Sequence, residues 1–319
     1  MQAANLAWIN GYLDYLAGQR QLAALTLEAY RRDLLELLAL ATDGDAQASL
    51  STIDHFRIRK FAATLHSRGL NARSIARKLS AWRGFFDWLA LSKVVAANPV
   101  DGIKPPKRNK TLPKALAADD AVRVVSETNT QATASPAQQA CNHAMFELLY
   151  SSGLRVSELV GLDIRYTKEG HYVSAGWIDF DAHEVTVTGK GSKARTVPVG
   201  QAAIDAFQTW LPLRAALVKL DPHPLFLSER GTRISARVLQ LRLKNHAQTI
   251  GLPTNVHPHV LRHSFASHVL QSSGDLRAVQ EMLGHASISA TQIYTSLDFQ
   301  RLAQVYDAAH PRARKKADK

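Results

Sequence analysis

Six side chains that can bind or react with a phosphodiester occur in a fixed order along the chain. They are Arg155, Lys190, His259, Arg262, His285 and Tyr294. Planar guanidinium groups offer paired N–H donors to phosphate oxygens, so two arginines can hold a phosphodiester from two sides. A phenol can attack phosphorus and form a covalent phosphotyrosine, while lysine and histidine can supply the proton transfers. The series therefore predicts transesterification of a phosphodiester.

The local sequences around these residues resemble the tyrosine recombinase (phage-integrase-like) family, whose catalytic set is Arg, Lys, His-x-x-Arg, His or Trp, and Tyr. The matching segments are G-L-R-V-S-E-L at Arg155, G-K-G-S-K-A-R at Lys190, H-P-H-V-L-R-H from His257, L-G-H at His285 and T-Q-I-Y-T at Tyr294. The resemblance covers essentially the whole chain. It is strongest over residues 148–195 and 257–314.

We expect Arg155 and Arg262 to hold the non-bridging phosphate oxygens as negative charge grows in the pentacoordinate state. His259 lies three residues before Arg262, on the same helical face, and a neutral imidazole there can accept the phenol proton of Tyr294. Tyr294 is the expected nucleophile, and His285 is expected to hydrogen-bond the scissile phosphate.

The resemblance implies two further roles, in which Lys190 protonates the departing 5′-oxygen and Glu158 holds the pocket together. Ordinary structural roles remain open beside them. Glu158 follows Arg155 by one helical turn, so the two can form a salt bridge. Lys193 competes with Lys190 for the proton-donating role.

Several histidines around His259 raise the alternative of a zinc site. They are His257, His263 and His268. No cysteine or suitable carboxylate lies in the same helix, and the resemblance implies chemistry without metal, ATP or other cofactor. We expect His263 to pack or hydrogen-bond internally.

The chain's length and charge favour a two-domain protein that binds a polyanion. Over 319 residues, 39 Lys and Arg exceed 27 Asp and Glu and leave a formal net charge of +12. Charge alone does not separate DNA from RNA or from an anionic membrane surface. The single cysteine, Cys141, excludes an intramolecular disulfide and fits a reducing cytoplasm. No signal peptide or membrane-spanning stretch is evident, so we expect a cytoplasmic protein.

The first hundred residues have the pattern of a helical domain. Helices are expected over Leu6–Ala17, Leu27–Ala41, Asp54–Ser67 and Asn71–Leu91. In the last of these an apolar stripe faces inward, and Asn71 is the predicted N-cap. Because few acids lie opposite its bases, we expect phosphate contact at least as much as a solvated face. The candidates are Arg73, Arg77, Lys78 and Arg83.

A basic, proline-rich segment predicts a linker between two domains. Residues 103–114 hold three prolines and five lysines or arginines without an acid, which is typical of an extended tether. We therefore divide the chain into a DNA-binding domain over 1–102, a linker over 103–115 and a catalytic domain over 116–319. Further DNA-binding candidates are Lys104, Lys107, Arg108, Lys110, Lys193 and Arg195.

The catalytic region is expected to be helical with one small sheet. A helix over Pro136–Ser151 ends at Gly153, and Arg155 begins the next turn. Strands are expected over Trp177–Phe180, Glu184–Thr188 and Ala194–Val199, with Lys190 at a hairpin tip. Later helices are predicted over Ala202–Leu220, Ser235–Ile250, Pro258–Gln271 and Leu276–Leu283. Residues 165–176 are longer than the connection usual in the family and predict either a lengthened strand or an extra loop.

The family resemblance implies a mainly α, two-domain clamp that rejoins DNA through a 3′-phosphotyrosyl link. The segment Leu283–Gln300 is closest to the chromosome-dimer resolvases of the family. These imply a dif-type DNA site, a cyclic tetramer of two plus two subunits with a paralogous recombinase, and regulation by a septal DNA translocase. Two alternatives stay open: a type IB topoisomerase, which needs no defined site, and a DNA-binding relative without catalysis.

The end of the chain predicts a helix over Asp298–Ala308 that serves assembly. Its apolar stripe of Leu297, Leu302 and Val305 needs a groove, because a short terminal helix is marginal alone. By resemblance that groove lies on the neighbouring subunit. The alternative is that the helix folds back on its own domain.

Overall fold

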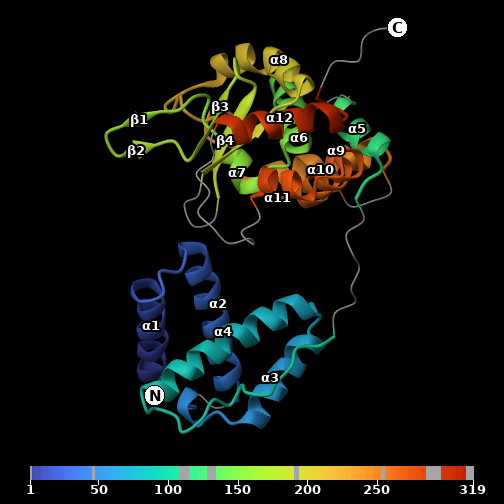
Figure 1. Cartoon of the computed structure of the whole chain (residues 1–319). Coiled ribbons are helices and arrows are strands. Elements are labelled where there is room, and N and C mark those ends of the chain that lie inside the picture. Colours follow the sequence, from blue (N-terminus) through green and yellow to red (C-terminus); the bar gives the residue numbers. More distant parts are fainter. Residues whose placement is uncertain are drawn as a thin grey trace. The chain divides into compact units, whose positions relative to one another are not determined.

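The computed structural model describes residues 2–44, 47–107, 115–127, 134–189, 194–252, 256–284 and 296–313, with only the backbone for 296–300. The chain forms two compact units, Met1–Thr111 and Leu112–Lys319 (Figure 1). Helices dominate both units, and the described part of the second also holds two small antiparallel sheets, one of three strands and one of two, so the predicted mainly α fold class is confirmed. None of the described helices is long and apolar enough to cross a membrane.

The described part of the first unit is a bundle of α1 (Gln2–Gly18), α2 (Ala24–Thr42), α3 (His55–Ser67) and α4 (Ala72–Leu91). Helix α4 buries the predicted stripe, in which Ile75, Trp82 and Phe86 are 0% exposed. Asn71 caps this helix, because its Oδ1 accepts a hydrogen bond of 2.8 Å from the Ser74 amide. The stripe and the cap are both confirmed.

The second unit is built around α6 (Pro136–Ser152), a helix that is buried along most of its length (Figure 1). Helices α8 (Gln201–Leu217) and α10 (Pro258–Ser273) pack against it. Strands β3 (Gly176–Asp179), β4 (Glu184–Thr188) and β5 (Ala194–Pro198) form a three-stranded antiparallel sheet in the order β3-β4-β5. The remaining described helices are α5 (Ala118–Ser126), α7 (Val156–Val160), α9 (Ala236–Thr249), α11 (Leu276–Leu283) and α12 (Ser296–Ala309).

A glycine turn joins α6 to α7 and sets the position of Arg155. Gly153 has φ +57°, and a Cβ there would come within 2.4 Å of the Phe265 ring, so the turn needs both the conformation and the small size of glycine. Two residues later Arg155 is the N-cap of α7. The predicted end of α6 and the start of a new turn at Arg155 are confirmed.

Residues 165–176 form a hairpin of their own. Strand β1 (Lys168–Glu169) pairs antiparallel with β2 (Tyr172–Val173) in a two-stranded sheet separate from β3-β4-β5. Buried Asp163 fixes the base of the hairpin, since it accepts hydrogen bonds from the Tyr172 hydroxyl at 2.8 Å and from Arg233 at 2.6 Å. Of the two predicted outcomes, the extra loop is correct.

The C-terminal tail packs on its own unit. Leu302 and Tyr306 of α12 are each 1% exposed and belong to the same apolar core as α6 and α10. Arg312 pairs with buried Glu147 of α6, and the Ala313 carbonyl accepts a hydrogen bond of 3.2 Å from the Gln201 amide. In this single chain the helix therefore lies in a groove of its own domain, which is the alternative named in the sequence analysis. Docking on a neighbouring subunit stays a prediction.

Candidate active site

Arg155 donates two hydrogen bonds to the Glu158 carboxylate at the start of α7. The Arg155 amide donates to Glu158 Oε2, and Arg155 Nη1 donates to Glu158 Oε1, each at 2.8 Å. The Glu158 side chain is 5% exposed, whereas that of Arg155 is 35% exposed. The salt bridge weighed as an alternative is thus present, and it holds one edge of a guanidinium whose other edge reaches solvent.

Arg195 holds the same carboxylate. Its two terminal nitrogens donate to the two Glu158 oxygens, each at 2.8 Å, and its Nε donates to the Met282 carbonyl at 2.9 Å. The side chain is 4% exposed. Its expected role in DNA binding is therefore wrong, because the guanidinium is turned into the domain and occupied by protein acceptors.

Arg262 reaches the same place from α10. Its Nη2 donates to the Leu283 carbonyl at 2.6 Å, and its Nη1 donates to the Gly153 carbonyl. Arg155 Nη2 donates to the next carbonyl, that of Gly284, at 3.4 Å. The structure thus brings Arg155, Glu158 and Arg262 together at the C-terminal end of α11. One pocket for the three was predicted from the sequence, but its position at a helix end was not.

The cluster has an excess of positive charge. Burial favours the neutral form of Glu158, but hydrogen bonds and the charge of Arg195, with bonds from Arg155, outweigh it and lower the pKa of Glu158 to about 2. Burial, together with the charge of Arg155, lowers the pKa of Arg262 to about 10, which still leaves it charged near neutral pH. Three guanidinium groups therefore meet one carboxylate among the described side chains, and the cluster suits an anion.

The donors that remain could bind that anion. A guanidinium has five N–H donors, and Arg155 and Arg262 each use two on the acceptors named above. Up to three remain on each side chain for phosphate oxygens. The arrangement can therefore hold a phosphodiester between two elements that are far apart in sequence.

The histidines of α10 divide into exposed and buried members. His259 is exposed, and its ring centroid lies 6.1 Å from that of His257, whose pKa is lowered by burial and by the charge of His259. His268 is buried between the Tyr150 hydroxyl and the Leu116 carbonyl. His263 is exposed, so the expectation that it packs internally is wrong. Within the described ranges no three His, Cys, Asp or Glu side chains gather to hold a metal.

The other predicted site residues lie outside the described residues. These are Lys190, Lys193, His285, Tyr294, Arg108 and Lys110. Their neighbours in the sequence are described: β4 ends at Thr188 and β5 starts at Ala194, on either side of Lys190. Gly284, which ends α11, directly precedes His285, and α12 begins two residues after Tyr294.

The basic residues of α4 differ in what they can contact. Lys78 is buried and pairs with Asp33 and Glu36 of α2, and Arg77 also pairs with Asp33. The expectation that these bases face few acids is therefore wrong for both. Arg83 is directed to the Val100 and Ile103 carbonyls, where it fixes the segment that follows α4.

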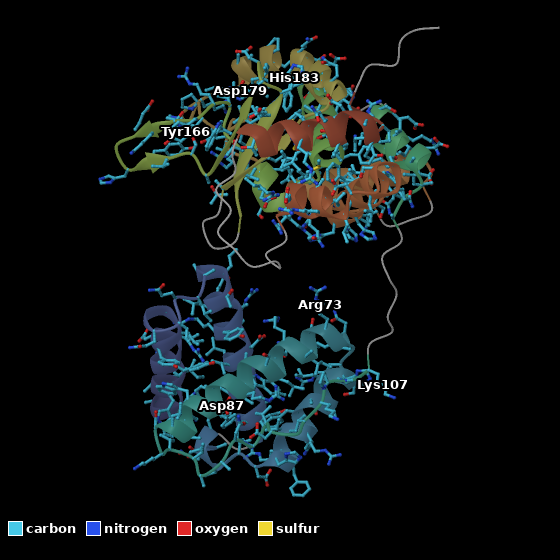
Figure 2. All side chains as sticks on the ribbon, in the orientation of Figure 1. Arg73, Asp87, Lys107, Tyr166, Asp179 and His183 are labelled. Atoms are coloured by element: carbon cyan, nitrogen blue, oxygen red, sulfur yellow. The ribbon has the colours of Figure 1, made fainter. Side chains whose placement is uncertain are left out.

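Three other DNA-binding candidates in the first unit have side chains that face solvent. Arg73 is exposed at the start of α4, and its side chain projects away from the helices (Figure 2). Lys104 and Lys107 are exposed on the segment beyond α4. These three, rather than Lys78, keep their charge available to a phosphate backbone.

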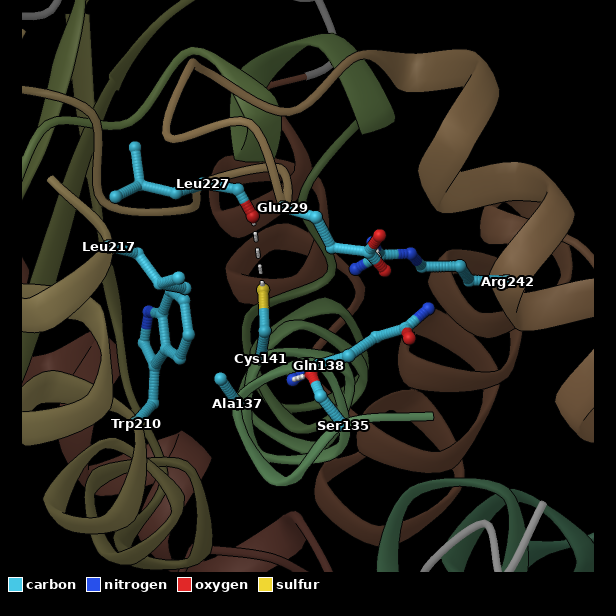
Figure 3. A pocket seen from close by; sticks show the side chains of 9 residues that line it. All are labelled: Ser135, Ala137, Gln138, Cys141, Trp210, Leu217, Leu227, Glu229 and Arg242. Atoms are coloured by element: carbon cyan, nitrogen blue, oxygen red, sulfur yellow. Dashed lines mark hydrogen bonds and ion pairs between the residues drawn. The ribbon is translucent and has the colours of Figure 1, made fainter. Parts of the chain in front are cut away.

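A cavity of about 300 Å³ lies elsewhere in the second unit (Figure 3). Trp210 and Leu227 line its apolar side, and an ion pair of 3.7 Å between Arg242 and Glu229 lies on its polar side. Cys141 lies against it with its thiol directed to the Leu227 carbonyl, and burial raises the pKa of that thiol to about 12. None of the arginine-cluster residues lines this cavity, so it is separate from the candidate active site.

The positions of Arg195 and Gly284 were missed by the reasoning from sequence. One signal was present, because Arg195 and Val197 lie two residues apart in a strand and therefore face the same side. Val197 is a core residue, so the alternation points Arg195 inward. The basic residues near Arg195 in the sequence had favoured a solvent-facing side chain.

Models of known families match both units. The model described as the phage integrase family matches residues 114–301, and that of the phage integrase N-terminal SAM-like domain matches residues 9–93. The first match alone covers more than half of the chain.

Individual relatives are similar along nearly their whole length. A protein named tyrosine recombinase XerC from Ralstonia pickettii is 54% identical over 314 residues, which are 97% of this chain and 94% of the relative. A protein of the same name from Pseudomonas aeruginosa is 45% identical over 310 residues, covering 97% and 96% of the two chains.

Solved structures share the fold at low identity. The XerH recombinase bound to a palindromic difH substrate in a post-cleavage complex matches with a TM-score of 0.69 at 22% identity, covering 95% of each chain. A lambda integrase dimer bound to a COC′ core site matches with a TM-score of 0.66 at 18% identity, covering 90% of this chain and 98% of that one.

Proposed function

The chain belongs to the phage integrase family and is a tyrosine site-specific recombinase, and we propose that it resolves chromosome dimers at a dif-type DNA site during chromosome segregation and cell division. The relatives named XerC support this role, as does the formal net charge of +12, which favours a DNA partner.

Cleavage begins with attack by the Tyr294 hydroxyl oxygen on the scissile phosphorus. The new bond joins phosphorus to the tyrosine oxygen, and the bond from phosphorus to the 5′-oxygen breaks. His259 accepts the phenol proton, and Lys190 gives a proton to the departing 5′-oxygen. The product is a 3′-phosphotyrosyl link and a free 5′-hydroxyl. Attack by the 5′-hydroxyl of a partner strand reverses these steps and rejoins the DNA.

Arg155 and Arg262 stabilise the pentacoordinate state, and His285 adds a hydrogen bond to the same phosphate. The observation that carries the proposal is the meeting of these two arginines at adjacent carbonyls of the α11 terminus, with net positive charge around them. An anion placed there meets donors that are already oriented, which is the condition for stabilising charge that develops during reaction. The protons and bonds in these steps balance without a metal ion or a nucleotide.

Recombination requires four strands to be cut and exchanged, so the active unit contains more than one chain. We propose a cyclic tetramer of two of these subunits and two of a XerD-like recombinase on the dif-type site, regulated by an FtsK-type DNA translocase. The XerH and lambda integrase structures contain DNA, and the latter is a dimer. The setting proposed for this assembly is the cytoplasm, where bacterial DNA lies.

A two-site assay tests this function. A supercoiled plasmid with two directly repeated dif-type sites is incubated with the protein and a XerD-like partner, without metal or ATP. We expect two smaller circles, whereas a plasmid with one site should only be bound. Relaxation of a plasmid lacking the site, by this protein alone, would instead identify a type IB topoisomerase.

A further inference from the structure

We propose that Arg195 is a positioning residue for DNA cleavage, which fixes Glu158 and the end of α11 so that Arg155 presents its free donors to the scissile phosphate. The proposal rests on the function proposed above, because it concerns the same reaction. It assigns a role to a side chain that lies below the phosphate-binding surface and does not face the DNA.

The contacts of Arg195 join three elements. It belongs to β5, it holds both oxygens of Glu158 in α7, and it donates to the Met282 carbonyl in α11. Paired donors to both carboxylate oxygens fix the plane of the carboxylate as well as its position. The plane in turn determines where Arg155 lies, since Arg155 Nη1 shares Glu158 Oε1 with Arg195.

Gly284 also depends on this arginine. A Cβ on Gly284 would lie 3.0 Å from Arg195 Cδ, so the two residues pack closely and a larger residue there would displace the Arg195 side chain slightly. Gly284 has φ +63° and offers its carbonyl to Arg155. Arg195 therefore bonds to one protein acceptor of the Arg155 side chain, Glu158, and packs against the other, Gly284.

Removing Arg195 would change how the charge of Glu158 is shared. In the native protein both Arg155 and Arg195 donate hydrogen bonds to the Glu158 carboxylate. Arg155 therefore needs only one side-chain N–H for Glu158, and its other N–H groups stay free. Without Arg195 the buried carboxylate would have Arg155 as its main partner and would draw that guanidinium inward. A misplacement of this kind near the reacting atoms can cost about 100-fold in rate.

Binding and cleavage should respond differently. Affinity for DNA comes largely from many phosphate contacts along the duplex, which Arg195 does not make. Cleavage depends on one phosphate held in one geometry. The expected signature is therefore a slow chemical step with nearly unchanged DNA affinity.

The test compares three variants on a suicide half-site duplex that traps the covalent adduct. Arg195→Met removes the ion pair with little change of volume, and Arg195→Lys restores one charge without the paired geometry. Arg214→Met is the matched control, because Arg214 is another buried arginine of this unit whose bonds go to the Pro222 and Pro224 carbonyls. Single-turnover adduct formation, half-site Kd and melting temperature are measured for each.

For Arg195→Met we expect adduct formation about 100-fold slower than in the parent, with the half-site Kd changed by less than about threefold. Arg195→Lys should recover part of the rate, and Arg214→Met should keep the parent rate even if it melts earlier. If Arg195→Met does not fold, Arg195→Lys tests the proposal instead. Its adduct formation should be at least about tenfold slower than that of the parent.

A second substrate separates positioning from a general loss of order. A methylphosphonate at the scissile position lacks the charge of one non-bridging oxygen, so it depends less on the arginines. The deficit of Arg195→Met should shrink on this substrate, whereas a domain that is merely loosened would be equally slow on both. A parent rate in Arg195→Met or Arg195→Lys, or an unchanged deficit on methylphosphonate, would overturn the proposal. Absence of any adduct with the parent protein would contradict the proposed function instead.

Discussion

Arg155 and Arg262 donate to the carbonyls of two consecutive residues, Gly284 and Leu283, although one belongs to the α7 cap and the other to α10. The carbonyls at a helix C-terminus carry partial negative charge, so the end of α11 is a suitable anchor for both guanidinium groups. The anchor fixes the spacing between the two arginines while leaving further donors free. A phosphodiester then binds to a pair that is already arranged.

Replacement of Arg262 by lysine should slow cleavage by about 100-fold or more, because an ammonium cannot hold two carbonyls and a phosphate oxygen in one plane. Binding of a half-site should weaken much less, since most phosphate contacts are elsewhere. Single-turnover adduct formation and a gel-shift titration measure the two effects. Equal losses in both would mean that Arg262 contributes to DNA binding and not to the chemical step.

Lys190→Ala should cleave ordinary DNA slowly, because an alkoxide is a poor leaving group without its proton. A 5′-bridging phosphorothioate has a leaving group that needs little protonation, so the variant should approach the parent rate on it. The measurement is the ratio of the two cleavage rates for parent and variant. If Lys190→Ala is equally impaired on both substrates, the proton donor is a different group, with Lys193 the next to test.

The pair between Arg312 and Glu147 should anchor the tail to α6. Arg312→Met leaves the carboxylate of Glu147, which is 0% exposed, without this partner. Loss of one member of a fully buried pair costs about 3–5 kcal/mol of unfolding free energy, while loss of both costs less. Here the cost is smaller, because Arg312 is 22% exposed and His143 lies 3.6 Å from the same carboxylate. We expect the double variant Glu147→Gln/Arg312→Met to be more stable than Arg312→Met in urea unfolding. Additive losses would show that the two side chains do not interact.

The tail should loosen in acid through His310. Burial, with a smaller effect of His268, lowers the pKa of His310 to about 3. The unfolded segment binds a proton near the ordinary value of 6.5, so tail packing is complete above that pH and weakens as the pH falls from 6.5 towards 3. Between pH 7 and pH 5 the loss from His310 is about 2 kcal/mol.

Hydrogen exchange of peptides from α12, corrected for intrinsic rates, measures this loss. Burial lowers the pKa of His268 as well, so it adds to the effect in the same direction. His310→Phe keeps a ring but cannot titrate, and it should show a smaller change between the two pH values. An equal change in this variant would assign the acid sensitivity to other groups.

Much of the fold follows from local patterns that act within single elements. The stripe and Asn71 cap of α4 were predictable because a 3.6-residue period and a side-chain cap need only neighbouring residues. Strand β4 and helix α11 match their predicted bounds for the same reason. Helix α5 was not predicted on its own, because its nine residues give a short pattern beside the basic linker.

The errors arose where the partner of a side chain lies far away in sequence. The sequence around Lys78 is typical of a solvent-exposed base. Its ion-pair partners, Asp33 and Glu36, are on another helix. The apolar stripe of the tail helix was predictable, but its packing against Gly200 and α6 within the same chain could not be read from the sequence. Arg155 and Arg262 could be assigned from spacing and resemblance, whereas the support from Arg195 required the strand register.

The central claim is that Tyr294 is the nucleophile of a phosphotyrosyl intermediate, and trapping on a nicked suicide duplex with a dif-type site tests it most directly. The parent protein should give a covalent protein–DNA band on a denaturing gel, with the adduct located at Tyr294 by mass spectrometry. Tyr294→Phe should bind the duplex with unchanged affinity and give no adduct, because one hydroxyl is lost and the basic surface is intact. An adduct that persists in Tyr294→Phe would contradict the account.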